Sequence, residues 1–299
     1  MFGIGISSNQ VFVHSHAILK VYNQSYNKVT LMRRCRLPGF EEQGKRVGKR
    51  NSVGNSEKLD ASLSRTRSKV LELALCNSWE YFVTLTLSPE NGNRRDLLAF
   101  KRSLSKWLNN LNYRKGCCIK YLLIPEPHAD GSWHMHGLFM GIPEDMLRPF
   151  TTQEHLPYRV LSMLRDGRKL FDWPAYAKKF GYVTCERIRD LDACAKYITK
   201  YITKYVTKGF SKAGSQLNKK LYLCSHGLKR ARTVCRGHLS KLFVPDFAND
   251  YVATKVFPSL GEAMALFQRN ISDPAPVGFW DVVNQHLGGV TEWTACPQT

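Results

Sequence analysis

The chain has 299 residues, of which 43% are hydrophobic, and its 44 lysines and arginines outnumber its 24 aspartates and glutamates by 20. This composition excludes a wholly disordered chain, and the lack of any apolar run near roughly 18 residues or of a signal-peptide pattern leads us to expect a soluble cytoplasmic protein. The positive charge favours a polyanionic partner, with nucleic acid first and an anionic membrane second.

Residues 1–32 contain short apolar runs that predict one or two strands. Residues 33–69 are basic and rich in glycine and serine, which is typical either of a solvated arm or of an arm that lies along nucleic-acid phosphates. Helices and strands then alternate. The predicted elements are a helix over 62–77, a strand over 79–89, a helix over 95–112, two strands over 118–142, a helix over 173–181, a strand over 181–189 and a helix over 190–209. Residues 255–270 also look helical.

This order predicts the α+β class, with an antiparallel sheet and helices packed on one face, as in ferredoxin-like folds. The length suits one large domain or two modest ones. We expect a basic N-terminal extension over residues 1–61, a folded domain over 62–232 and a C-terminal extension over 233–299.

The segment WHMHGLF places His134 and His136 on one face of a strand, because alternate side chains share a face. A three-residue turn over 129–131, with Gly131 in the left-handed conformation, pairs Glu126 with His134. Two imidazoles and a carboxylate on one rigid hairpin suit a divalent metal site with open positions. His128 is a candidate outer group, and a half-buried histidine pair without metal is the plainer alternative.

The segment AKYITKYITKYVTK repeats tyrosine and lysine every four residues. On a helix, four residues advance about 400°, so Tyr197, Tyr201 and Tyr205 form one slowly turning stripe. Either the stripe is half core with snorkelling lysines, or it carries chemistry. Ammonium groups favour the phenolate, and a divalent metal polarises a phosphodiester, so these parts suit the transfer of a phosphodiester onto tyrosine.

Three segments in this order resemble the motifs of rolling-circle replication initiators of the HUH endonuclease superfamily, of bacterial plasmid or small-phage type. They are FVTLTLSP (82–89), WHMHGLF (133–139) and YITKYITK (197–204), and YLCSHGLKR (222–230) also resembles a segment that follows in related replication proteins. The resemblance covers residues 62–232 and implies a ferredoxin- or RRM-like nuclease core with an antiparallel sheet of about five strands.

The resemblance also implies the site. His134 and His136 match the histidine motif, and Glu126 matches an acidic ligand that some members place about eight residues upstream, so Mg²⁺ or Mn²⁺ is the expected cofactor. Tyr197, Lys200, Tyr201 and Lys204 match the pattern of members with two tyrosines. In that family, tyrosine attacks single-stranded origin DNA and leaves a 5′-phosphotyrosine link and a free 3′-OH.

The third copy of the repeat, with Tyr205 and Lys208, departs from the two-tyrosine pattern and leaves the working pair open. Tyrosines that follow the histidines favour an initiator over a conjugative relaxase, while some transposases share this order. No phosphate-binding loop is present in the sequence, so unwinding is expected to need a host helicase, and synthesis a host DNA polymerase.

Other residues leave alternatives open. A zinc site from Cys224, His226, Cys235 and His238 has a spacing that suits no common zinc finger. Thr84 and Thr86 alternate on the first motif strand, where strand propensity explains them as well as function does. Trp79, Tyr81 and Phe82 suit a core, or stacking on bases. A single-strand nucleic-acid-binding protein without catalysis is the alternative to an enzyme.

Overall fold

The computed structural model describes residues 12–36, 56–209, 221–241, 243–249 and 251–267. The chain divides into two compact units. Residues 51–230 form the larger unit, and residues 1–50 and 231–299 together form the smaller one. Within the described part, no helix is long and apolar enough to cross a membrane.

The larger unit contains an antiparallel sheet of seven strands in the order β6-β7-β8-β3-β5-β4-β9. The strands are β3 (Tyr81–Thr86), β4 (Lys120–Pro127), β5 (Trp133–Met140), β6 (Arg148–Pro149), β7 (Leu170–Asp172), β8 (Val183–Arg187) and β9 (Leu223–Cys224). The helices are α1 (Ser56–Leu75), α2 (Leu97–Lys115), α3 (Tyr158–Arg165), α4 (Pro174–Lys179) and α5 (Leu191–Gly209), with short 3₁₀ turns at Pro89–Asn91 and Glu144–Met146.

Local sequence sets where these elements begin and end. In α2, the Asp96 carboxylate accepts a hydrogen bond from the Ala99 amide at 2.9 Å and caps the first turn. The helix ends at Gly116, whose φ of 62° is in the left-handed region that glycine adopts at least cost. In β3, buried and half-buried residues alternate, as expected of a strand whose two faces meet different surroundings.

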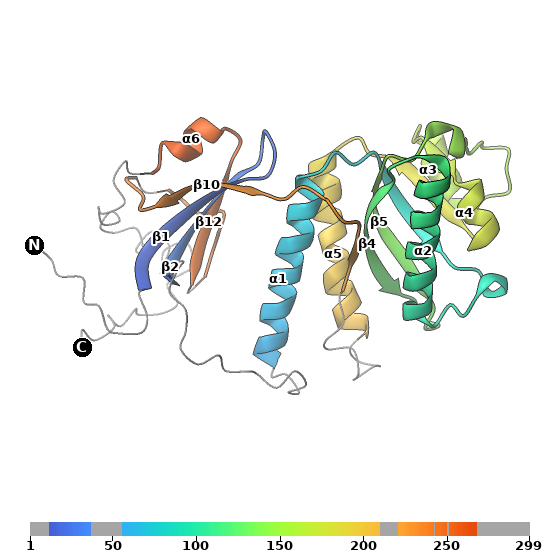
Figure 1. The fold of residues 1–299 in the computed structure, drawn as a ribbon, viewed down its shortest axis with the longest axis horizontal. Coiled ribbons are helices and arrows are strands. Elements are labelled where there is room, and N and C mark those ends of the chain that lie inside the picture. Colours follow the sequence, from blue (N-terminus) through green and yellow to red (C-terminus); the bar gives the residue numbers. More distant parts are fainter. Residues whose placement is uncertain (1–11, 37–55, 210–220, 242, 250, 268–299) are drawn as a thin grey trace, which may run out of the picture. The chain divides into compact units, whose positions relative to one another are not determined.

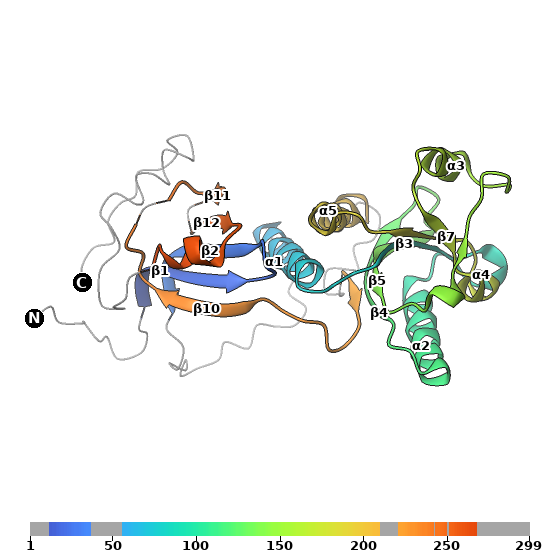
Figure 2. The ribbon, with the colours of Figure 1, turned by 90° about the horizontal axis from the view of Figure 1, so that it is seen from above.

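Helices cover both faces of this sheet (Figures 1 and 2). Phe139 of β5 contacts Trp173 beside α4, and the Trp173 ring contacts Trp107 of α2. On the opposite face, His136 of β5 contacts Tyr201 of α5, and α1 packs against α5.

The α+β class and the antiparallel sheet are therefore confirmed. Two details differ from the prediction: the sheet has seven strands rather than about five, and its helices lie on both faces rather than one. The reason lies in the central strands. Six consecutive residues of β4 are buried, so both of its faces need cover.

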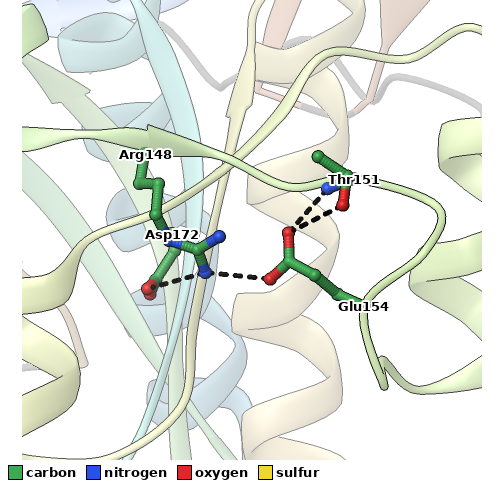
Figure 3. Close-up of polar contacts among 4 residues, drawn as sticks. All are labelled: Arg148, Thr151, Glu154 and Asp172. Carbon is green, nitrogen blue, oxygen red and sulfur yellow. Dashed lines mark hydrogen bonds and ion pairs between the residues drawn. The ribbon is translucent and has the colours of Figure 1, made fainter.

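A segment that the sequence did not predict, β6, α3 and β7, lies between β5 and β8 (Figure 3). The Arg148 guanidinium lies 2.9 Å from Glu154 Oε2 and 3.5 Å from Asp172 Oδ2. Glu154 Oε1 accepts hydrogen bonds from the Thr151 amide and hydroxyl. Val160 of α3 packs with Phe150 and Leu170.

The register of β7 decides which face α3 covers. Leu170 is opposite Glu186, and Glu186 is opposite Phe82, so Leu170 and Phe82 share a face. Phe82 contacts Tyr197 of α5. Helix α3 therefore lies on the same face as α5, next to the tyrosines.

The smaller unit contains a five-stranded antiparallel sheet in the order β10-β1-β2-β12-β11. Its elements are β1 (Phe12–Val21), β2 (Asn27–Arg36), β10 (Arg232–Gly237), β11 (Phe247–Ala248), β12 (Val252–Phe257) and α6 (Leu260–Met264). Its core includes Leu19, Leu31 and Phe257. The strands expected within residues 1–32 are present.

The helix expected over residues 255–270 is largely wrong. Residues 255–257 belong to β12, the helix is limited to α6, and residues 268–270 lie outside the described ranges. Pro258 explains the difference, because proline cannot donate to a continuing ladder and the residue before it is disfavoured in helices.

Gly137 of β5 gives a first prediction. A Cβ there would lie 2.2 Å from the Leu122 carbonyl oxygen and 2.6 Å from a Leu123 methyl carbon. We expect Gly137→Ala to lower the free energy of unfolding by about 3 kcal/mol, because backbone blocks the new methyl group. Urea unfolding would measure this. Gly261→Ala is the control, since its Cβ meets only the Ser259 hydroxyl at 3.5 Å; equal stability of the two variants would contradict the prediction.

Candidate active site

One face of the central strands collects the polar residues that the sequence singled out. Glu126 of β4 is directly opposite His134 of β5, as predicted from the turn. Gly131 has a φ of 82°, and the His128 amide donates to the Ser132 carbonyl at 2.8 Å. The predicted hairpin register is therefore confirmed.

Glu126 and His136 are in direct contact. The Glu126 Oε2 atom lies 2.9 Å from the His136 Nε2 atom, and the Glu126 residue is 8% exposed. In a neutral ring, the Nε2–H group donates this hydrogen bond, because a carboxylate only accepts. The pair therefore joins two of the three predicted metal ligands in a partly dry environment.

Two threonines of β3 bond the other ring nitrogens of the histidines. The Thr84 Oγ1 atom lies 3.1 Å from the Nδ1 atom of His136, and the Thr86 Oγ1 atom lies 3.0 Å from the Nδ1 atom of His134. The register of β3 against β5 places each threonine directly opposite its histidine. Sequence reasoning left these residues open, because threonine is also common in strands for reasons of packing.

His134 is held in its neutral form. Burial, together with the positive charges of His128 and His136 when protonated, lowers the pKa of His134 to about 4, while Glu126 and Asp130 oppose the shift. The rings of His128 and His134 lie 3.8 Å apart between centroids. At neutral pH, His134 thus keeps a nitrogen lone pair for a ligand.

Helix α5 brings two tyrosines to this face. The Tyr201 ring stacks on the His136 ring, with centroids 4.4 Å apart and planes 21° from parallel. The Tyr201 hydroxyl donates a hydrogen bond to the Tyr197 hydroxyl at 2.7 Å. Tyr197 also contacts Phe82 of β3, with ring centroids 5.6 Å apart. The buried Ile198 anchors the same helix.

The two tyrosines differ in environment. Tyr201 is 8% exposed and Tyr197 is 42% exposed. Burial raises the pKa of Tyr201, and the hydrogen bond to Tyr197 and the charges of Tyr197 and Glu126 raise it further, against a smaller opposite effect of Arg159. Tyr201 is therefore a protonated donor at neutral pH, and Tyr197 is the accessible phenol.

The remaining predicted residues are placed less fully. Lys200 is exposed on α5. Lys204 and Tyr205 belong to the same helix by their backbone, but their side chains lie outside what the structure describes. The roles predicted for these residues stay predictions.

As the side chains stand, no group of three or more His, Cys, Asp or Glu within the described ranges is arranged to hold a metal ion. This finding includes Cys224 and His226 of the larger unit and Cys235 and His238 of the smaller unit, which the sequence offered as a zinc set. The chemistry of Glu126 and His136 nevertheless fits a divalent cation. Two ligands at right angles and about 2.1 Å from an ion are about 3.0 Å apart, and their atoms are 2.9 Å apart.

Comparison with known proteins locates the same part of the chain. Residues 80–208, which span β3 to α5, match the family model described as Replication-associated protein ORF2. No curated protein and no solved structure matches the chain. The resemblance to rolling-circle replication initiators is thus confirmed for this segment, and the domain is a replication-associated one.

The cap of α5 gives a second prediction. The Asp190 carboxylate accepts a hydrogen bond from the Ala193 amide at 3.0 Å. We expect Asp190→Ala to lower the free energy of unfolding by about 1 kcal/mol, through loss of this bond. Asp192→Ala is the control, because Asp192 lies in the first turn. Its removal weakens only the favourable interaction with the helix dipole, by about 0.5 kcal/mol. Urea unfolding of both variants would decide, and a larger loss for Asp192→Ala would contradict the assignment of the cap.

Proposed function

We propose that this protein initiates rolling-circle replication by nicking single-stranded DNA at an origin through tyrosine transesterification assisted by a divalent metal. The observation that carries the proposal is the stacking of Tyr201 on His136, which brings the tyrosine helix onto the histidine hairpin. The family match over residues 80–208 supports it. In a sheet protein with a net charge of +20, a nucleic-acid substrate is also favoured by charge.

Tyr197 is the better nucleophile for the first cleavage. Its ring is more exposed than that of Tyr201, so a phosphodiester reaches its hydroxyl more easily. The Tyr201 hydroxyl already donates to the Tyr197 oxygen, and such a donor stabilises negative charge that develops there. Tyr201 would act in a second cleavage only after it leaves the stack on His136.

The bonds balance in the proposed step. The Tyr197 oxygen forms a bond to phosphorus and loses its proton to solvent, while the bond from phosphorus to the 3′ oxygen breaks. The 3′ oxygen takes a proton from solvent and becomes the free 3′-OH, and the 5′ phosphate stays on Tyr197. No oxidant, reductant or nucleotide cofactor is needed.

His134, His136 and Glu126 would hold the cation, Mg²⁺ or Mn²⁺. When bound, such an ion polarises the phosphodiester and offsets charge on its oxygens. The low pKa of His134 keeps its ring neutral, as a ligand must be. Lys200 and Lys204 would contact DNA phosphates, and a host helicase and DNA polymerase would continue synthesis from the 3′-OH.

The central test is a covalent adduct. The protein is incubated with Mn²⁺ and labelled single-stranded oligonucleotides that tile the DNA molecule carrying its gene, and the products are run on a denaturing gel. We expect a protein–DNA band with the wild type, a loss of at least 100-fold in Tyr197→Phe and a smaller loss in Tyr201→Phe. Tyr113→Phe is the control, since Tyr113 is 90% exposed on α2, which packs against the opposite face.

The outcomes separate the hypotheses. A band that survives in Tyr197→Phe and disappears in Tyr201→Phe would reverse the assignment of the nucleophile. Salt-sensitive binding without any band, across all oligonucleotides and with metal present, would favour a binding protein without catalysis and contradict the enzyme.

The metal site gives a separate prediction. Glu126→Gln keeps the shape of the side chain but removes its charge, so we expect the affinity for Mn²⁺ to fall at least tenfold. DNA affinity should fall less than threefold, because phosphate contacts carry the binding. Electron paramagnetic resonance of free Mn²⁺ and fluorescence anisotropy measure the two quantities. Glu144→Gln, at an exposed turn, is the control; equal Mn²⁺ affinity of the two variants would contradict the role of Glu126.

A further inference from the structure

The two threonines of β3 have no part in the reaction proposed above, yet each bonds one of the two histidines. Thr84 and Thr86 are directly opposite His136 and His134 in the register, and both hydroxyls lie within 3.1 Å of a ring nitrogen. Strand propensity alone explains threonine at these positions but not the pairing of both hydroxyls with Nδ1 atoms.

We propose that Thr84 and Thr86 are positioning residues that direct the Nε2 atoms of His136 and His134 to the side of the sheet where Glu126 and the cation would lie. The part that concerns the cation rests on the proposed function. The part that concerns ring orientation does not, because the hydrogen bonds exist in the protein without metal.

The geometry limits what each ring can do. A histidine on a strand rotates about two side-chain bonds, and a partner at Nδ1 removes most of that freedom. For His136, the Nε2 atom then lies 2.9 Å from Glu126 Oε2. On its other side, the Tyr201 ring covers the imidazole face. The Thr84 hydroxyl is thus the contact that fixes which nitrogen meets the carboxylate.

The hydroxyl has a property that other partners lack. Without metal, the neutral His136 ring donates from Nε2 to Glu126, so its Nδ1 atom must accept a proton from Thr84. A metal ligand needs the reverse, with a lone pair on Nε2 and a proton on Nδ1. A hydroxyl accepts from Nδ1–H as readily as it donates to Nδ1, whereas a carboxylate or a carbonyl only accepts. Threonine therefore holds the ring in both tautomers.

The chain offers a matched control. Thr184 of β8 is directly opposite Thr84, on the same face of the sheet and one strand further from His136, and it is also half-buried. Valine has nearly the shape of threonine without the hydroxyl. Thr184→Val therefore repeats the change in shape and polarity on this face without removing a bond to either histidine.

The experiment compares Thr84→Val and Thr86→Val with Thr84→Ser, Thr86→Ser and Thr184→Val. Side-chain ¹⁵N–¹H spectra of the metal-free proteins report the tautomer of each histidine. Electron paramagnetic resonance reports the affinity for Mn²⁺. We expect the valine variants to show mixed tautomers at the opposed histidine and an affinity about tenfold to 100-fold lower, as for other partners of metal ligands. The serine variants should stay within threefold of the wild type, and Thr184→Val should match it.

Two results would overturn the proposal. The first is a wild-type tautomer pattern and affinity in both Thr84→Val and Thr86→Val. The second is equal loss in the serine and valine variants, which would assign the effect to the threonine methyl group. A wild type that binds no Mn²⁺ contradicts the proposed function and with it the cation part, while the spectra of the metal-free proteins still decide whether the hydroxyls orient the rings.

Discussion

The contact between Tyr201 and His136 is the interaction on which the site depends. A centroid distance of 4.4 Å at 21° between planes joins a helix and a strand that are far apart in the sequence. It exists because β5 alternates its side chains, so that the histidines face α5 while Phe139 faces the opposite layer. A shift of one residue in the β4–β5 register would turn the histidines away from Glu126. The hairpin turn at Gly131 thus sets the composition of the site.

The same burial that forms this contact also sets the protonation of its members. It raises the pKa of Tyr201 and lowers that of His134, since a buried group disfavours its charged form. One hydroxyl therefore keeps its proton and one imidazole stays neutral at the same pH. The two groups are suited to different tasks, the first to donating a hydrogen bond and the second to offering a lone pair.

Local rules predicted the parts of this fold that depend on neighbouring residues. The hairpin, the capped helices and the shared face of Glu126, His134 and His136 follow from turn length, capping and alternation. The segment from β6 to β7 did not, because its elements are too short for a clear period and its Arg148 network joins residues 24 positions apart. The smaller unit did not either. Its sheet pairs β2 with β12, about 220 residues later, and no local pattern indicates such a partner.

Repetition in the sequence proved a poor guide to equivalence in the structure. Tyr197 and Tyr201 have the same neighbours in the chain, yet one is 42% exposed and the other 8%. A four-residue step rotates a side chain by about 40° and moves it by about 6 Å along the helix, which is enough to carry it from the rim of the sheet to its interior. Thr84 and Thr86 teach the converse. Their residue type satisfies both strand propensity and the histidine nitrogens, so sequence alone has no means to separate the two causes. Only the positions of the Nδ1 atoms distinguish a residue that merely suits its strand from one that orients a neighbouring ring.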